Sequence, residues 1–333
     1  MGKFLDAERI RQAKLKASSP HFSEAARSEG VYKGNLRSFC WPLDCAEENL
    51  FAGIRQTVPD YFAAHDIKWH DGRNGKPSNH LCDSQVCCVN FLLPLADKPR
   101  ALAEGLRSIF PGLRRMLPVE DEQYVAFEWI GLENYLGERI RPGAKRTRGA
   151  LCTSADAAVL FERINGQRQM VLIEWKYTES YGSASVKFAS SGTDRTQIYR
   201  PLYDRDDCPL NKDLLPSFDS LFYRPFYQLM RQQLLAHEME KSHELGANIV
   251  SVLHIAPARN TDFHRITAPQ LEHLGETATD VWTKLVRPEG RFISVSTERL
   301  FGNLTAEQVP EIQTWIEYTG KRYAWVQAGS MDS

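Results

Sequence analysis

Two acidic residues and one lysine are the residues of this sequence whose types and spacing could do chemistry. Asp156 opens one short apolar stretch and Glu174-Trp175-Lys176 ends the next, with the turn signal NGQRQ at 165–169 between them. In an antiparallel hairpin the start of the first strand lies beside the end of the second, so the two carboxylates should meet. Alternation along a strand puts Glu174 and Lys176 on one face and Trp175 on the other. The spacing therefore predicts two acids and one amine at one end of a hairpin.

This group of side chains fits the hydrolysis of a phosphodiester. The reaction needs charge stabilisation on the phosphate, a nucleophilic water and help for the leaving oxygen, and a divalent cation held by two carboxylates supplies much of this. Mg2+ suits the ligand set, with Mn2+ as a substitute, because it prefers oxygen and is commonly held by only one or two carboxylates. Lys176 could orient or deprotonate the attacking water, or neutralise charge on the phosphate, and the sequence does not choose between these roles.

The elements that must position these residues follow from the hydrophobic pattern. We expect helices where apolar residues recur at helical spacing, at residues 47–64, 81–96, 98–110, 225–241, 279–286 and 309–318. We expect strands where short runs are β-branched, aromatic or continuously apolar, at residues 124–130, 155–164, 170–177, 248–255 and 291–295. The order helix, three strands, helix, strand predicts an α/β fold with a mixed central sheet flanked by helices.

Composition divides the chain into three regions. Residues 1–75 are rich in polar residues and turn formers and are interpreted as an N-terminal appended region, which a turn-rich linker at 71–80 joins to the rest. Residues 76–300 are expected to form the core, and residues 301–333 a C-terminal helical extension packed on it.

Charge and hydropathy exclude several classes of protein. The 333 residues carry a formal charge of −1 and are 42% hydrophobic, so any nucleic-acid surface must be local. The longest uncharged apolar stretch, 84–96, is too short for a bilayer, which takes about 20 apolar residues. The N-terminus mixes charges where a secretory signal needs an apolar block. We therefore expect a cytoplasmic protein with no membrane partner.

The cysteines offer an alternative kind of site. Two CxxxxC pairs are formed by Cys40 with Cys45 and by Cys82 with Cys87, and histidines at 70 and 80 lie nearby, so a structural zinc site is one interpretation. Strong zinc sites usually have pairs two residues apart, and buried reduced thiols are the other interpretation.

The sequence resembles the PD-(D/E)XK nuclease superfamily in SADAAVLF and VLIEWKYTE, and the likeness spans about residues 80–256. The motifs SQVCCVNFLLPL, FEWIGLENYLGE and PFYQLMRQQLLA look like a bacterial group of restriction-endonuclease-like proteins within it. The resemblance implies a restriction-endonuclease-like core in which Asp156, Glu174 and the carbonyl of Trp175 hold the metal and Lys176 serves the water. Ala155 stands where the family name has proline.

The resemblance also suggests two further site residues. Gln228 matches a glutamine that recombination-type members carry on the helix after the third strand, although Gln232 replaces the aromatic expected four residues later. An upstream acid often completes such sites, and Glu133, just past the end of the first strand, is preferred over Glu128 within it.

Basic residues near the hairpin are candidates for phosphate contacts. A loop before the Asp156 strand and an insertion after the Glu-x-Lys strand supply them: Arg139, Arg141, Lys145, Arg146, Arg148, Lys187 and Arg195. A solvated surface turn is the alternative interpretation of such a charge run.

Together these features predict a Mg2+-dependent deoxyribonuclease that acts on DNA. One alternative is a catalytically inactive module of the same fold that binds nucleic acid or docks a partner, and another is a hydrolase of small phosphate esters. A homodimer is suggested by relatives that cut both strands.

Overall fold

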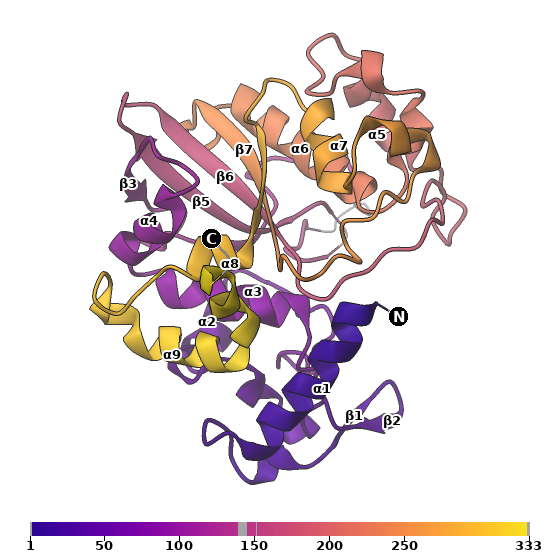
Figure 1. The fold of residues 1–333 in the computed structure, drawn as a ribbon. Helices are drawn as coiled ribbons and strands as arrows, with labels where there is room; N and C mark the ends of the chain where they lie inside the picture. Colours follow the sequence, from indigo (N-terminus) through magenta and orange to yellow (C-terminus); the bar gives the residue numbers. More distant parts are fainter. Residues whose placement is uncertain (1, 139–144, 151, 332–333) are drawn as a thin grey trace.

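A six-stranded mixed sheet forms the centre of the protein (Figure 1). The structure is a computed structural model and describes residues 2–138, 145–150 and 152–331. The strands are β3 (Leu113–Leu117), β4 (Ala126–Trp129), β5 (Ala155–Arg163), β6 (Arg168–Trp175), β7 (Ile249–Ala256) and β8 (Phe292–Ser296). Strands β3 and β4 pair with the same edge of β5, β5 pairs antiparallel with β6, and β6, β7 and β8 are mutually parallel.

Helices cover both faces of this sheet (Figure 1). One face packs on α6 (Phe226–Lys241) and α7 (Ala278–Leu285), with α5 (Thr196–Tyr203) at its margin. The other packs on α2 (Thr57–Ala64), α3 (Ser84–Leu92), α4 (Pro99–Arg107), α8 (Thr297–Phe301) and α9 (Gln313–Arg322). Side chains of β6 alternate between the two cores, with Leu172 towards α6 and Ile173 towards α3. The predicted α/β architecture with a mixed central sheet flanked by helices is confirmed.

The predicted strands and helices correspond to observed ones, with one partial exception. The chain at 47–64, expected to form one helix, is broken into a 3-10 segment at Leu43–Asn49, a 3-10 turn at Ala52–Ile54 and α2. Gly53 lies at the break, and glycine costs about 1 kcal/mol in a helix interior. Strand β3 and helix α5 were not predicted.

The N-terminal part of the chain contributes α1 (Lys3–Ser18) and a small hairpin of β1 (Gly30–Tyr32) and β2 (Asn35–Arg37), seen at the bottom of Figure 1. Lys33 and Gly34 link the two strands, both with positive φ, which is the conformation of a two-residue type I′ turn. The division of the chain at residues 75 and 300 stays a prediction. Within the described ranges, no helix combines the length and apolar character that crossing a membrane requires.

Candidate active site

The hairpin of β5 and β6 brings Asp156, Glu174 and Lys176 to one cavity of about 550 Å³. The Trp175 backbone N–H donates to Asp156 Oδ2 over 2.6 Å, and the Nζ of Lys176 lies 2.6 Å from Glu174 Oε1. The register explains this, because Ala157 pairs with Ile173 and the next step outward sets residue 156 beside residue 174. The predicted meeting of two acids and one amine is therefore present.

Helix α6 forms another wall of the cavity. Glu174 continues the side of β6 that faces α6, while Trp175 packs into the opposite core, as predicted. Gln228 lines the cavity, and its Oε1 accepts a hydrogen bond of 2.8 Å from the Tyr181 hydroxyl. Gln232 Nε2 donates over 2.5 Å to the carbonyl oxygen of Ser154, which ties the helix to the residues just before Asp156.

Glu128, the second choice for the upstream acid, lies in the cavity as a third carboxylate. Its side chain is buried and accepts hydrogen bonds from Gln85 Nε2 at 2.8 Å and from Ser154 Oγ at 2.6 Å. His70 Nε2 lies 3.3 Å from Glu128 Oε1. The sequence did not single out Gln85, Ser154 or His70 as partners of this acid.

Glu133, the preferred choice, is exposed and does not line the cavity. The difference arises in β4, where Glu128 has a φ of +48° that breaks the regular strand. Trp129 consequently packs into the same core as Ala126, whereas strict alternation would send it to the opposite face. The irregular backbone thus places the acid within the strand, rather than the one beyond it, beside Asp156.

Electrostatics within the cavity is dominated by buried like charges. Burial raises the pKa of Asp156 well above its usual range, and the charges of Glu174 and Glu128 raise it further, against the opposing effect of Lys176. Burial also raises the pKa of Glu128. Such a crowd of carboxylates is unfavourable without a cation, so the donor set fits a hard divalent ion.

Lys176 is held in its charged form. Burial lowers its pKa, but attraction to Glu174, and then to Tyr181, Asp156 and Glu179, outweighs burial and sets the pKa well above its usual value. The side chain is therefore an ammonium at neutral pH.

Four of the expected phosphate-binding residues, Arg146, Arg148, Lys187 and Arg195, have internal partners. Arg139 and Arg141 lie outside the described residues, and Lys145 is exposed. The Arg146 guanidinium donates to four consecutive backbone carbonyls, of residues 130–133, at 2.7–2.9 Å.

The remaining three basic residues are likewise engaged. Arg148 makes a two-pronged ion pair with Glu120 at 2.9 and 2.5 Å. Lys187 pairs with Asp219 at 2.8 Å, and Arg195 donates to the Val186 carbonyl at 2.6 Å. These side chains hold loops in place, and contacts to phosphate stay a prediction for them.

The cysteines do not form a zinc site in the described part of the chain. All seven are free, and Cys40, Cys82 and Cys87 are buried. No group of three or more His, Cys, Asp or Glu side chains arranged to hold a metal ion is found among the described residues. This also applies to the acidic cavity, where a Mg2+ ion would need water and substrate oxygens to complete its ligands.

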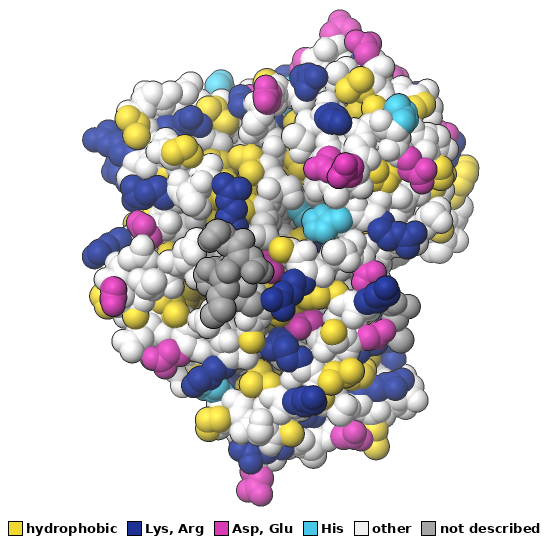
Figure 2. All heavy atoms as spheres, viewed as in Figure 1, with side chains coloured by type: hydrophobic (Ala, Val, Ile, Leu, Met, Phe, Trp, Pro, Cys, Tyr) yellow, Lys and Arg dark blue, Asp and Glu magenta, His cyan; other side chains and the backbone are white. Residues whose placement is uncertain are grey.

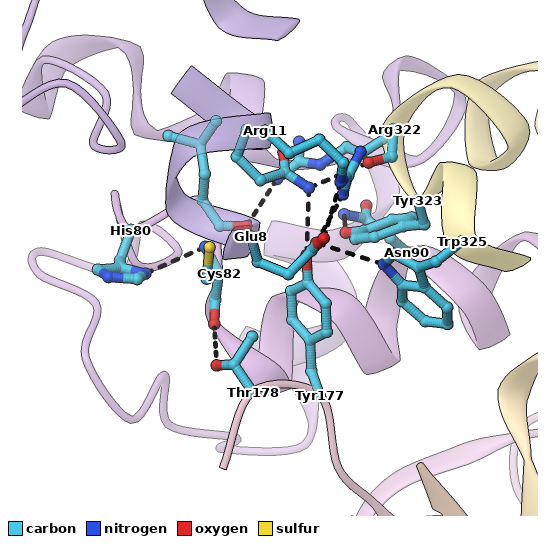
Figure 3. Close-up of polar contacts among 12 residues, drawn as sticks. Glu8, Arg11, His80, Cys82, Asn90, Tyr177, Thr178, Arg322, Tyr323 and Trp325 are labelled. Carbon is cyan, nitrogen blue, oxygen red and sulfur yellow. Dashed lines mark hydrogen bonds and ion pairs between the residues drawn. The ribbon is translucent and has the colours of Figure 1, made fainter. Parts of the chain in front are cut away.

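A buried polar network anchors the chain just after Lys176 (Figure 3). The Tyr177 hydroxyl donates to Glu8 Oε2 at 2.5 Å and accepts from Gln12 Nε2 at 3.1 Å. Glu8 also pairs with Arg11 and accepts from the Trp325 indole N–H at 3.3 Å. Helix α1 and the C-terminal segment are thereby tied to the end of the strand that carries the site.

The fold and the cavity together define an α/β protein whose central hairpin carries an acid–acid–lysine cluster, with a third acid beside it. The comparison with protein families agrees with this class, since the family described as Restriction Endonuclease associating with ARP matches residues 9–324. The chain belongs to this restriction-endonuclease-like family. No curated protein and no solved structure matches the chain.

Proposed function

We propose that this protein is a Mg2+-dependent phosphodiesterase that cleaves DNA, with Mn2+ as a substitute. The observation that carries the proposal is the shared cavity in which Lys176 pairs with Glu174 while Asp156 and Glu128 add two further carboxylates. Membership of a restriction-endonuclease-like family supports a nuclease-like activity. The chain runs α4, β3, β4, β5, β6, α5, α6, β7, so the elements expected for a PD-(D/E)XK core are present, together with the additional strand β3 and helix α5.

The residues have distinct roles in this proposal. Asp156 and Glu174, with the Trp175 carbonyl, would hold the ion, and Glu128 is the candidate third acid. The ion would supply charge stabilisation at the phosphate and activation of water. Lys176, held as an ammonium, is suited to stabilising negative charge on the phosphate rather than to removing a proton. The Gln228 side-chain oxygen already accepts a hydrogen bond from the Tyr181 hydroxyl. The side-chain N–H groups of Gln228 would therefore be the atoms that donate to a phosphate.

The test compares wild-type protein with Asp156→Ala and Lys176→Ala on plasmid and linear DNA, with Mg2+, Mn2+ or EDTA. Cleavage that needs the metal and both residues is expected. Glu162→Gln is the matched control, because Glu162 lies on the same strand but pairs with Arg114 and Arg115 on the surface. Binding without cleavage by wild-type protein would favour the inactive module, and turnover of small phosphate esters alone would favour the small-molecule hydrolase.

The state of assembly belongs to the same proposal. A homodimer would allow two such sites to act on the two strands of a duplex. Sedimentation of the protein with and without duplex DNA measures this directly.

A further inference from the structure

Two other cavities adjoin the site cavity, one on each side. The first, of about 480 Å³, lies against the β1–β2 hairpin and shares Ser84 and Glu179 with the site cavity; we call it the hairpin cavity. The second, of about 920 Å³, lies against α5 and α6 and shares Arg224 and Arg231 with the site cavity; we call it the helix cavity. The site cavity, which holds the acidic cluster, therefore adjoins both of the others, and those two share no lining residue with each other.

Each outer cavity contains a guanidinium that has no hydrogen-bond or ion-pair partner within the described ranges. The Arg37 side chain, at the end of β2, is exposed in the hairpin cavity and makes no hydrogen bond or ion pair with any residue that the structure describes. The same is true of Arg224, which precedes α6 and lines both the site and helix cavities. Arginines free of internal ion pairs are the ones able to bind phosphate, because their forked donors are unused.

Other charged and aromatic side chains of the hairpin cavity bear on whether it can bind phosphate. In the hairpin cavity, Lys33 lies over the Tyr32 ring with Nζ 5.0 Å from its centre, so a cation and an aromatic face stand together. Asp71 in that cavity accepts a hydrogen bond from the Tyr32 hydroxyl, and Glu179 at the border accepts one from the Tyr177 backbone N–H. These two acids thus have internal donors, whereas the Arg37 guanidinium has no hydrogen-bond or ion-pair partner among the described residues.

On the face that Figure 2 shows, Lys and Arg side chains are interspersed with Asp and Glu. A small phosphate ester would need only the central cavity, since about 300–1,000 Å³ accommodates a small-molecule ligand. Three such cavities in series, with phosphate-binding groups on both sides of the acids, fit a chain of nucleotides.

We infer that the substrate is a polynucleotide strand that runs from the hairpin cavity, past Asp156 and Glu174, to the helix cavity, with Arg37 and Arg224 contacting phosphates on opposite sides of the cut. This inference deepens the proposed function and rests on it for the reaction. The N-terminal hairpin is accordingly part of the substrate-binding surface.

The experiment measures binding of fluorescein-labelled 30-nucleotide DNA, single-stranded and duplex, by anisotropy in Ca2+ at several salt concentrations. Arg37→Ala and Arg224→Ala are each expected to weaken binding about five- to tenfold. Each should also reduce the slope of log K against log salt by about 0.7 for single strands or about 0.9 for duplex. Arg299→Ala, which removes an exposed arginine on α8 that lines none of the three cavities, is the matched control and should change neither quantity.

Thermal unfolding checks that each variant is folded, and Arg37→Glu should weaken binding more than Arg37→Ala. Wild-type affinity and salt slope in Arg37→Ala would overturn the inference, as would an absence of DNA binding by wild-type protein at low salt. If wild-type protein cuts DNA but Arg37→Ala binds normally, the path is wrong and the activity stands. If binding depends on both arginines but no DNA is cut with Mg2+ or Mn2+, the path stands and the proposed reaction is wrong.

Discussion

The metal-free protein should become more stable when Asp156 is replaced by asparagine. Burial and the charges of Glu174 and Glu128 raise the pKa of Asp156 well above its usual value of 3.8, so the ionised carboxylate opposes folding. Asparagine keeps an oxygen that can accept the 2.6 Å hydrogen bond from the Trp175 N–H, while it removes the charge. The substitution therefore separates the electrostatic cost of the site from its packing.

The size of the effect follows from proton linkage. One unit of pKa corresponds to about 1.4 kcal/mol, so at pH 7 a carboxyl with a usual pKa of 3.8 can cost at most about 4 kcal/mol. Asp156 keeps some access to the cavity, and solvent screening reduces the expected gain to about 1–3 kcal/mol. Because the folded pKa is raised, the folded state binds more protons, and the wild-type protein loses stability as pH rises above 4. The gain should therefore shrink between pH 7 and pH 4.

Denaturant unfolding in EDTA at pH 7 and pH 4 measures this gain. Mg2+ should then stabilise the wild-type protein, by about 2.7 kcal/mol at one hundred times its Kd, and stabilise Asp156→Asn much less. Glu162→Gln, on the exposed end of β5, controls for the loss of a carboxylate. If Asp156→Asn is less stable than wild type in EDTA at pH 7, attraction to Lys176 outweighs the repulsion among the acids, and our account of the site is wrong.

Three further outcomes are expected. Lys176→Met should reduce cleavage at least about 100-fold while DNA is still bound, as rapid-quench and anisotropy assays would show; near-normal cleavage would remove Lys176 from the chemistry. Arg146→Ala should lower the free energy of unfolding by about 1–3 kcal/mol, because four backbone carbonyls lose their donor, as denaturant unfolding would show. Burial lowers the pKa of His80 to about 4, so its contribution to stability is lost as pH falls from 6.5 towards 4, by about 3 kcal/mol. His80→Asn, which can still accept from the Cys82 N–H, should flatten the stability profile in that window, and an unchanged profile would contradict this cause.

The hairpin and its three chemical residues could be predicted because the information is local. A turn of a few residues fixes the register of β5 and β6, and alternation then decides which side chains share a face. The apolar runs that form α3, α6 and β7 are likewise long and continuous enough to identify their elements. None of these predictions required knowing which distant segments meet.

The upstream acid could not be chosen in the same way. Both Glu128 and Glu133 are near the end of one strand in sequence, and the choice depends on the positive φ at Glu128 and on partners from residues 70, 85 and 154. Those partners come from segments far apart in the chain. A positive φ at a glutamate is an unusual conformation, and no local sequence signal marks it.

The buried face of helix α1 could not be predicted from the sequence either. In α1, Ile10 is 61% exposed, and the buried stripe consists of Glu8, Gln12 and Lys16. Glu8 accepts from the Tyr177 hydroxyl, Gln12 Nε2 donates to the Arg322 carbonyl, and Lys16 donates to the carbonyls of residues 28 and 40. Hydrophobic periodicity cannot identify a helix face that is buried through hydrogen bonds.

The density of charge in the sequence likewise does not show which basic side chains folding leaves without an internal partner. Arg146 and Arg148 belong to a conspicuous basic run, but the structure uses their donors on backbone carbonyls and on Glu120. Arg37 and Arg224 stand alone in sequence, yet neither guanidinium has a hydrogen-bond or ion-pair partner among the residues that the structure describes, and each lies beside a cavity that adjoins the acids. Affinity for phosphate depends on donors that folding leaves unpaired, and pairing is a property of tertiary structure.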